Sequence, residues 1–232
     1  MLERLIDQMR LIHHAARIVA GRWFWLAALL PLLWLGFQYI SVILGWRATS
    51  YEIVDAQNKL IGFPLAILAA GLGVRVIAGE IDLRTLEIAY TVPGGAHRVW
   101  LAKLGASFLI LLVAEALLAI TTFVFLTSFA WSTLYGALQS AVFFLVLAMG
   151  LGALFKSEAA GGMVCAGVLT LALMTTVLRI SPFFNIELSA DLDAVERMAR
   201  LVQNRIGYVI LTLAVMLLTF GRAEQRERML SG

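Results

Sequence analysis

Charged residues suited to a functional site gather in one segment of this sequence, between Ala78 and Gly105. The segment reads AGEIDLRTLEIAYTVPGGAHRVWLAKLG and lies between two long apolar runs. Its charged side chains are Glu80, Asp82, Arg84, Glu87, Arg98 and Lys103, and a Pro-Gly-Gly break begins at Pro93. No Ser-His-Asp or paired-carboxylate arrangement stands out in the chain, so this pattern favours recognition of a partner over catalysis.

Two other patterns resemble nucleotide or metal sites but have the wrong spacing. The run GLGALFKS, residues 150–157, has the outline of a phosphate-binding loop but lacks a glycine directly before Lys156. We therefore expect no ATPase site and no enzymatic activity in this chain. His13 and His14 point about 100° apart on a helix. The single cysteine, Cys165, allows no disulfide within the chain. We expect neither a metal nor a cofactor here.

Glu115 is the one charged residue deep inside an apolar run. At about 1.5 Å of rise per residue, it lies roughly 18 Å along a helix from Lys103, near the middle of a bilayer. A carboxyl group at that depth is costly and usually faces a bundle interior or water. Glu115 is therefore a candidate intramembrane polar site, either in a transport path or proton relay or as a protonated group in a structural hydrogen bond.

The composition indicates a helical protein with several membrane spans. Hydrophobic residues make up 61% of the 232 residues and charged residues 14%, against about half and about a quarter in average soluble domains. The mean hydropathy is +0.90. The net charge of +3 comes from basic residues that mostly flank apolar runs, which is typical of membrane orientation. We therefore expect lipid, and not nucleic acid, as a partner.

The apolar runs predict six spans, since roughly 20 residues cross the ~30 Å hydrocarbon core. These are Trp23–Leu44, Leu60–Ala78, Trp100–Leu126, Ser132–Phe155, Ala159–Leu178 and Ile206–Phe220. Pro31 and Pro64 predict kinks within the first two spans. Small residues in Ala69–Gly73 and Ala148–Gly152 permit close helix packing.

The first residues predict an amphipathic helix over 2–20. Its apolar positions follow the i, i+3, i+4 pattern, and charged side chains fill the other face. Such a helix suits the headgroup plane of a membrane, or a dock on a soluble partner. We divide the chain into this interfacial helix, residues 1–22, and a six-helix membrane domain, residues 23–232.

The distribution of Lys and Arg predicts the orientation. With the N-terminus inside, twelve of the 18 Lys and Arg residues fall on the cytoplasmic side, which favours both termini in the cytoplasm. The charged segment is then cytoplasmic and residues 179–205 lie outside. Within the latter, DLDAVERMARLVQ predicts a short outer-surface or re-entrant element that precedes the last span.

On a helical wheel, part of the charged segment is predicted to form a short amphipathic helix. Glu80, Arg84, Glu87 and Thr91 make one narrow polar stripe with apolar residues on both sides, and the helix is expected to stop at Pro93. Such a helix would fit a groove on another protein. The alternative is a helix that rests on the membrane surface.

The run EIDLRTLEIAYTVP, followed by HRVWLAKL, resembles the first cytoplasmic loop of ABC-2-type exporter permeases. The positions that carry the resemblance are Glu80, Thr85, Leu86, Glu87, Pro93, Arg98, Lys103 and Leu104. The layout is similar too: an amphipathic N-terminal helix, six spans, cytoplasmic termini and an outer segment between spans five and six.

The resemblance implies that this loop is a coupling helix inserted into a cleft of a separate ATPase subunit. The expected coupling residues are Glu80, Arg84, Thr85, Leu86, Glu87 and Pro93. It further implies two ATPase copies that bind ATP and Mg²⁺, a second permease subunit, identical or different, and a place in the bacterial plasma (inner) membrane. The substrate is not indicated.

Two other classes compete with the exporter permease. An ion-coupled secondary carrier or channel would need more intramembrane charge than Glu115 provides. A non-transporting assembly or anchoring subunit would share the membrane spans but not the ATPase partner.

Overall fold

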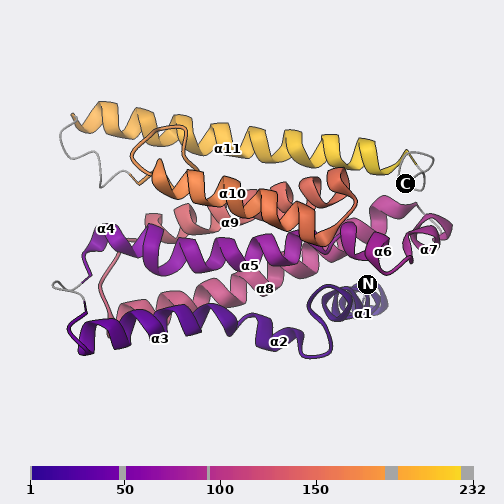
Figure 1. Cartoon of the computed structure of the whole chain (residues 1–232), viewed down its shortest axis with the longest axis horizontal. Coiled ribbons are helices and arrows are strands. Elements are labelled where there is room, and N and C mark those ends of the chain that lie inside the picture. The colour runs from indigo at the N-terminus through magenta and orange to yellow at the C-terminus, as the bar shows by residue number, and fades with distance from the viewer. Residues whose placement is uncertain (1, 47–50, 93–94, 186–192, 226–232) are drawn as a thin grey trace.

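Long apolar helices form the architecture of the chain in a computed structural model, which describes residues 2–46, 51–92, 95–185 and 193–225 (Figure 1). Within these residues no strand is found, and five helices are long and apolar enough to cross a membrane. They are Phe24–Ile43, Ile53–Val74, Ala96–Phe125, Trp131–Phe155 and Ala194–Ala223. The chain is thus an all-helical membrane protein, as the composition predicts.

The fifth predicted span, Ala159–Leu178, corresponds to a shorter helix, α10 (Glu158–Met174). Its 17 residues fall below the roughly 20 that a membrane-spanning helix needs, so the count of six spans stays a prediction. After α10 the chain continues in turns, and Phe183 and Phe184 are buried against the neighbouring helices.

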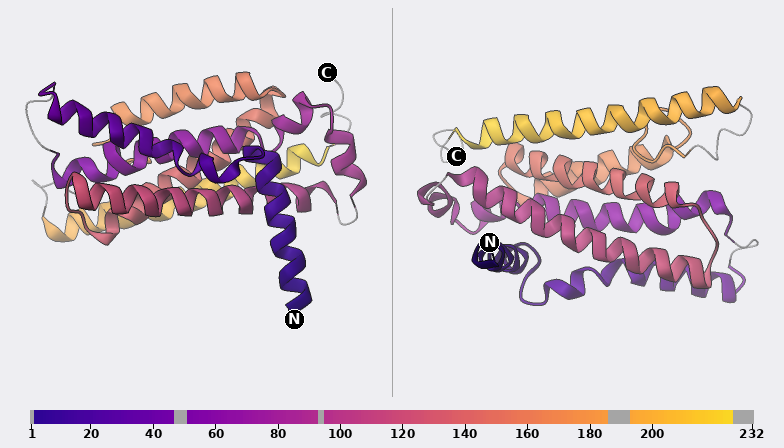
Figure 2. Two further views of the ribbon diagram at one scale, coloured as in Figure 1. Left: turned by 90° about the horizontal axis from the view of Figure 1, so that it is seen from below. Right: turned by 180° about the vertical axis from the view of Figure 1, so that it is seen from behind.

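The centre of the bundle is the contact between α5 (Phe63–Val74) and α9 (Trp131–Phe155). On one side of this pair lie α10 and α11 (Ala194–Ala223), and on the other lie α8 (Ala96–Phe125) and α3 (Leu30–Ile43) (Figures 1 and 2). The long helices run side by side, so the molecule has two ends. We call them the α6–α7 end, which carries the charged segment, and the α4 end.

Small residues allow the central helices to approach closely. A Cβ atom at Gly73 of α5 would overlap the carbonyl oxygen of Leu145 in α9. A Cβ atom at Gly161 of α10 would lie 2.6 Å from the Cα atom of Gly152 in α9. Gly73 and Gly152 belong to the two small-residue runs that predict close packing, and that prediction is confirmed.

The two prolines that predict kinks stand where one helical segment follows another. Pro31 lies in the first turn of α3, after the short helix α2 (Phe24–Ala27), and Pro64 lies in the first turn of α5. Proline is tolerated in the first turn of α3 because the first N–H groups of a helix have no intrahelical acceptor. Pro64 instead lies just after the change from a π-helical turn to α5, within the continuous helix Ile53–Val74. Before α5 come α4 (Ile53–Asp55) and the π-helix η1 (Ala56–Gly62), so the second span begins earlier than predicted.

The prediction of a separate element before the last span is wrong for residues 194–205. They form the first part of α11, which continues without a break through 30 residues. Nδ2 of Asn204 donates to the carbonyl oxygens of Arg179 and Ser181, at 2.6 and 2.9 Å, and so ties this helix to the turns after α10. Residues 186–192 lie outside the described residues.

The predicted N-terminal helix is confirmed as α1 (Leu2–Ala20). It projects sideways from the long helices, as Figure 2 shows in its left-hand view. Ala15, Ala16 and Val19 are buried, and α1 packs on α8. Ile18 is exposed. A helix in this orientation would lie along the membrane surface if the bundle crosses the bilayer.

Candidate functional site at the α6–α7 end

The charged segment folds as two short helices, α6 (Ala78–Asp82) and α7 (Leu86–Thr91). The chain turns a corner between them at Arg84, whose φ of 56° lies in the left-handed region. The prediction of one helix with a single polar stripe is therefore wrong, because this corner interrupts the helical periodicity. Pro93, where that helix was expected to stop, lies outside the described residues.

Glu80 faces the interior of the bundle and not the surface. Its side chain ion-pairs with Nζ of Lys103 at 2.6 Å, and Nε1 of Trp100 donates to its other oxygen at 3.1 Å. Glu80 is 7% exposed and Lys103 2% exposed. Nζ of Lys103 also donates to the carbonyl oxygen of Val76 at 3.2 Å. A buried ion pair is tolerated only when further hydrogen bonds satisfy both charges, and this one fastens α6 to α8.

Asp82 connects the same segment to α10. The backbone N–H of Glu158, at the start of α10, donates to Oδ2 of Asp82 at 2.9 Å. A carboxylate at a helix N-terminus satisfies a free N–H and interacts favourably with the helix dipole. Arg75, at the end of α5, lies 3.6 Å from the Glu158 carboxylate and adds an ion pair across the same junction.

Tyr90 connects α7 to the end of α11. Its hydroxyl donates to the carbonyl oxygen of Ala223 at 2.5 Å. The Tyr90 ring meets Trp100 edge-on, with centroids 6.2 Å apart, and Trp100 stacks on Phe220 of α11 at 6.1 Å. The segment between α5 and α8 is therefore held by contacts with α8, α10 and α11 together.

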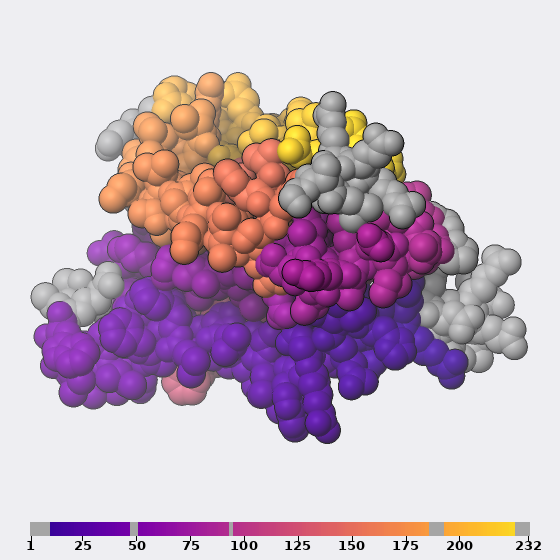
Figure 3. Space-filling model, turned by 45° about the vertical axis from the view of Figure 1, so that its right-hand side comes forward, coloured from indigo at the N-terminus to yellow at the C-terminus, as the bar shows by residue number. Residues whose placement is uncertain are grey.

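The outer side of the segment is apolar with charged flanks. Leu83 is 67% exposed and Ile88 65% exposed, and Arg84 and Glu87 are exposed beside them. With Thr91, also exposed, these residues form what we call the α6–α7 surface. Figure 3 shows this part of the chain, in magenta, on the outside of the molecule. An exposed apolar pair beside opposite charges is suited to a complementary groove on another protein.

The residues assigned to coupling by resemblance thus divide into two groups. Arg84 and Glu87 point outward, whereas Glu80 and Leu86 are buried. Thr85 lies between the groups, half-buried, with its backbone N–H donating to the carbonyl oxygen of Glu80 at 2.8 Å.

Sequence reasoning missed the contacts of Asp82, Tyr90 and Trp100. Asp82 is a charged residue outside the predicted polar stripe, and this departure was itself a signal that the helix breaks there. Trp100 and Lys103 are three residues apart and therefore share a face of α8. The indole N–H of Trp100 and the ammonium group of Lys103 could thus be expected to donate to one common acceptor. The acceptor, Glu80, could not be identified without the corner between α6 and α7.

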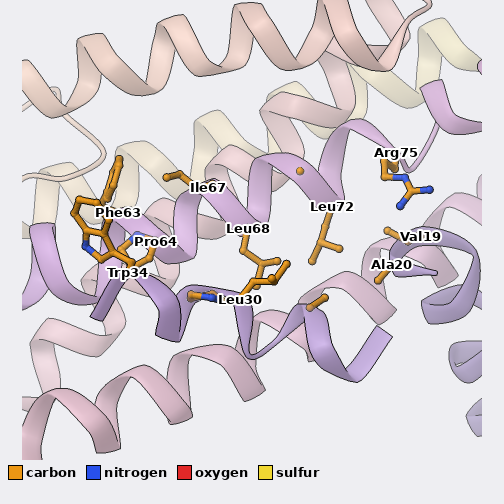
Figure 4. A pocket seen from close by; sticks show the side chains of 13 residues that line it. Val19, Ala20, Leu30, Trp34, Phe63, Pro64, Ile67, Leu68, Leu72 and Arg75 are labelled. Atoms are coloured by element: carbon orange, nitrogen blue, oxygen red, sulfur yellow. The ribbon is translucent and has the colours of Figure 1, made fainter. Parts of the chain in front are cut away.

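A groove beside the site runs along α3 and α5. Its first cavity, of about 370 Å³, is lined mainly by apolar side chains and has Arg75 at one end. Figure 4 shows Trp34 and Phe63 close together at the other end of this cavity. Their rings meet edge to face, with centroids 4.9 Å apart, and Nε1 of Trp34 donates to the carbonyl oxygen of Lys59 at 2.8 Å.

A second cavity, of about 490 Å³, lies beyond the same two rings, toward the α4 end. Its lining is more polar and includes Gln38, Asp55 and Asn58. Oδ1 of Asn58 is buried without a hydrogen-bond partner among the described residues. Because Trp34 and Phe63 line both cavities, the groove is apolar near the α6–α7 end and polar beyond the aromatic pair.

The structure does not bring Glu115 to the charged segment. It lies farther along α8, 7% exposed, and its Oε1 has no hydrogen-bond partner among the described residues. It lines a separate groove between α8 and α9.

In the described part of the chain, no group of three His, Cys, Asp or Glu side chains lies together as metal ligands would. His13 packs edge-on against Phe24, with centroids 5.3 Å apart. Cys165 is buried in α10 as a free thiol.

Comparisons of the chain with protein-family models, with curated proteins and with solved structures found no match.

Proposed function

We propose that this chain is the permease subunit of an ATP-driven exporter of the ABC-2 type. The observation that carries the proposal is that the charged segment has a buried, bonded inner side and an exposed outer side. Its inner side is fastened to α8, α10 and α11 through Glu80, Asp82 and Tyr90. Its outer side offers exposed apolar and charged groups to a partner.

This arrangement suits the transmission of force. A partner that moves the α6–α7 surface would displace α8 through the buried Glu80–Lys103 pair. The same displacement would reach α10 through Asp82 and α11 through Tyr90. Three membrane helices would then move with one small segment, which is what conversion of ATPase closure into transport requires.

The proposed partners follow from this function. Two ATPase subunits would bind ATP and Mg²⁺, and a second permease subunit would complete the pathway. The proposal places the α6–α7 end, α1 and both termini in the cytoplasm of a bacterial cell, with the bundle in the inner membrane. In that arrangement α10 would serve as the fifth of six spans.

Co-purification tests the proposal. The tagged chain should bring along an ATPase subunit with a Walker motif, and the complex should hydrolyse ATP. Glu87→Lys and Ile88→Asp should each lower the amount of bound ATPase, since both alter the α6–α7 surface. Glu196→Lys is the matched control, because Glu196 is an exposed carboxylate near the opposite end of α11.

Two results would contradict the proposal. One is a wild-type chain that folds and purifies without any ATPase. The other is a pair of surface variants that bind the ATPase and hydrolyse ATP as the wild type does.

One observation favours a second candidate, an ion-coupled carrier. Glu115 is a buried carboxyl group whose Oε1 has no partner in the described structure, and proton-coupled carriers use such groups. A carrier of this kind would transport in vesicles that hold a proton gradient but no ATP, whereas the ABC-2 proposal requires ATP.

A further inference from the structure

A groove on the outer face of α8 and α9 surrounds Glu115. It runs from the second half of α8 to the first turns of α9, with a volume of about 580 Å³, within the range of about 300–1,000 Å³ typical of ligand sites. Apart from Glu115, its wall is apolar and includes Ile120, Phe123, Phe129 and Trp131. We call it the Glu115 groove.

Glu115 is the only charged side chain in the wall of this groove as the described residues define it. The side chain is 7% exposed, and its Oε1 lacks a hydrogen-bond partner among the described residues. The structural hydrogen bond considered from the sequence is therefore not found for this oxygen. An unpaired carboxyl group in an apolar wall is costly, and a bound group of complementary charge would reduce that cost.

In the described structure, the basic residues of the long helices lie mostly toward helix ends. The one farthest from the ends of its helix is Arg205 of α11, whose Nη1 donates to Oε1 of Gln139 at 3.0 Å. Its guanidinium also lies over the Tyr135 ring, 5.4 Å from the centroid. Arg205 is therefore already engaged and is not a free cation for the Glu115 of a second copy, so we assign the complementary charge to a ligand.

The aromatic part of the wall specifies the kind of cation. Phe123 and Phe129 meet edge-on, with centroids 6.1 Å apart, and Trp131 is exposed beside them. Aromatic faces attract cations, most strongly where water is excluded. A compact ammonium group is strongly hydrated and would lose that hydration at this depth, whereas a cation with a delocalised or shielded charge loses less.

We propose that the Glu115 groove binds a lipophilic organic cation. Its charge pairs with the Glu115 carboxylate, and its apolar body packs on Phe123, Phe129 and Trp131. The ligand reaches the groove from the lipid phase, since α8 exposes Ile120 and Phe123 on that side. This site does not depend on the exporter proposal, because it needs only this chain and no ATPase.

Binding of tetraphenylphosphonium tests the site directly. The purified full-length chain, in phosphatidylcholine nanodiscs, is titrated with the radiolabelled cation, with empty nanodiscs as the background. Tetraphenylborate serves as the matched probe, since it has the same shape and the opposite charge. We expect saturable binding of the cation and none of the anion.

Glu115→Gln removes the charge and nearly preserves the shape, so its affinity for tetraphenylphosphonium should fall about tenfold to a hundredfold, as for loss of a hydrogen-bonded charge. Ala119→Phe fills the groove and leaves the carboxylate in place, because Ala119 lines the wall, and it should also abolish binding. Glu196→Gln removes an exposed carboxylate of α11 and should bind as the wild type does.

Each other outcome overturns the proposal. Cation binding that is absent, or that Glu115→Gln leaves unchanged, excludes a role of the carboxylate. Equal binding of tetraphenylborate shows that the groove takes any apolar body, such as a lipid chain. A change from dimer to monomer in Ala119→Phe, measured by size-exclusion chromatography with light scattering, shows that a second copy covers the groove. If Glu115→Gln fails to fold, the wild-type chain alone tests the proposal. Binding of tetraphenylphosphonium without binding of tetraphenylborate then supports a cation site, and equal binding of the two contradicts it.

Discussion

Glu80 illustrates how a single buried charge constrains its surroundings. Its carboxylate accepts from Lys103 and from Trp100, and all three side chains are buried. When one member of such a cluster is removed, most of the lost stability is the cost of leaving the other charge buried without a partner. The attraction between the two charges contributes less. The cluster therefore holds α6 in one position relative to α8 as long as all its members are present.

Removal of one member should be far more damaging than removal of both charges. Glu80→Ala leaves the Lys103 ammonium buried without a carboxylate and should lower the free energy of unfolding by about 3–5 kcal/mol. Adding Lys103→Met should recover much of that loss, since the buried charge is then gone. The measurement is the thermal unfolding midpoint of the purified protein in detergent.

Glu87→Ala is the matched control for these variants, because Glu87 is an exposed glutamate of the same segment. It should unfold at the wild-type temperature. If Glu80→Ala does so as well, the buried pair does not fasten α6 to α8, and the route for force through Lys103 has to be abandoned.

At this scale the sequence predicts which residues matter better than it predicts where they point. Glu80 and Glu87 were both placed on one polar stripe, but only Glu87 is exposed. The difference arises at Arg84, whose positive φ is uncommon for a residue other than glycine. A periodicity argument assumes an unbroken helix, so it cannot anticipate a corner at an arginine.

Among the elements, α5 and α9 have the most extensive contact, and glycine makes it possible. Gly73 faces the backbone of α9 at Leu145, and a side chain there would collide with the carbonyl group. At Gly71, on the same helix, a Cβ atom would have no described atom of another element within 4 Å. Two glycines two residues apart therefore differ in what a methyl group would meet.

This difference predicts opposite results for the same substitution. Gly73→Ala should push α5 away from α9 and cost about 1–3 kcal/mol, as overpacking does. Gly71→Ala should be neutral or slightly stabilising, because alanine favours a helix more than glycine does. Thermal unfolding of the two variants in the same detergent makes the comparison. Equal midpoints would show that the two helices are not packed through Gly73.

The sequence predicts elements well where hydrophobicity alone defines them. The third and fourth spans differ from α8 and α9 by only a few residues at their ends. Prediction from the sequence fails where hydrogen bonds of polar residues, and not hydrophobicity, determine where a helix begins. The second span starts with α4 and the π-helix η1, and η1 contains the polar Gln57 and Asn58. The low hydropathy of this part kept it out of the predicted span. The polar first part of α11 was separated from the last span for the same reason.

Considered as a whole, the molecule has two chemically distinct ends. The α6–α7 end carries the buried Glu80–Lys103 pair and the exposed apolar pair of Leu83 and Ile88. The α4 end carries polar side chains in the neighbouring helices, such as Gln139, which pairs with Arg205. Geometry distinguishes the two ends, whereas the assignment of one of them to the cytoplasm rests on the distribution of basic residues.

Thiol labelling tests that assignment. Arg84 lies at the α6–α7 end and Asp193 precedes α11 at the opposite end (Figure 1), and both are exposed. The native Cys165 is buried, so it should contribute little background. With a membrane-impermeant maleimide, Asp193→Cys should react in intact cells, whereas Arg84→Cys should react only after the membrane is permeabilised. The reverse pattern would place the α6–α7 surface outside the cell, where no ATPase could reach it, and would exclude the coupling function.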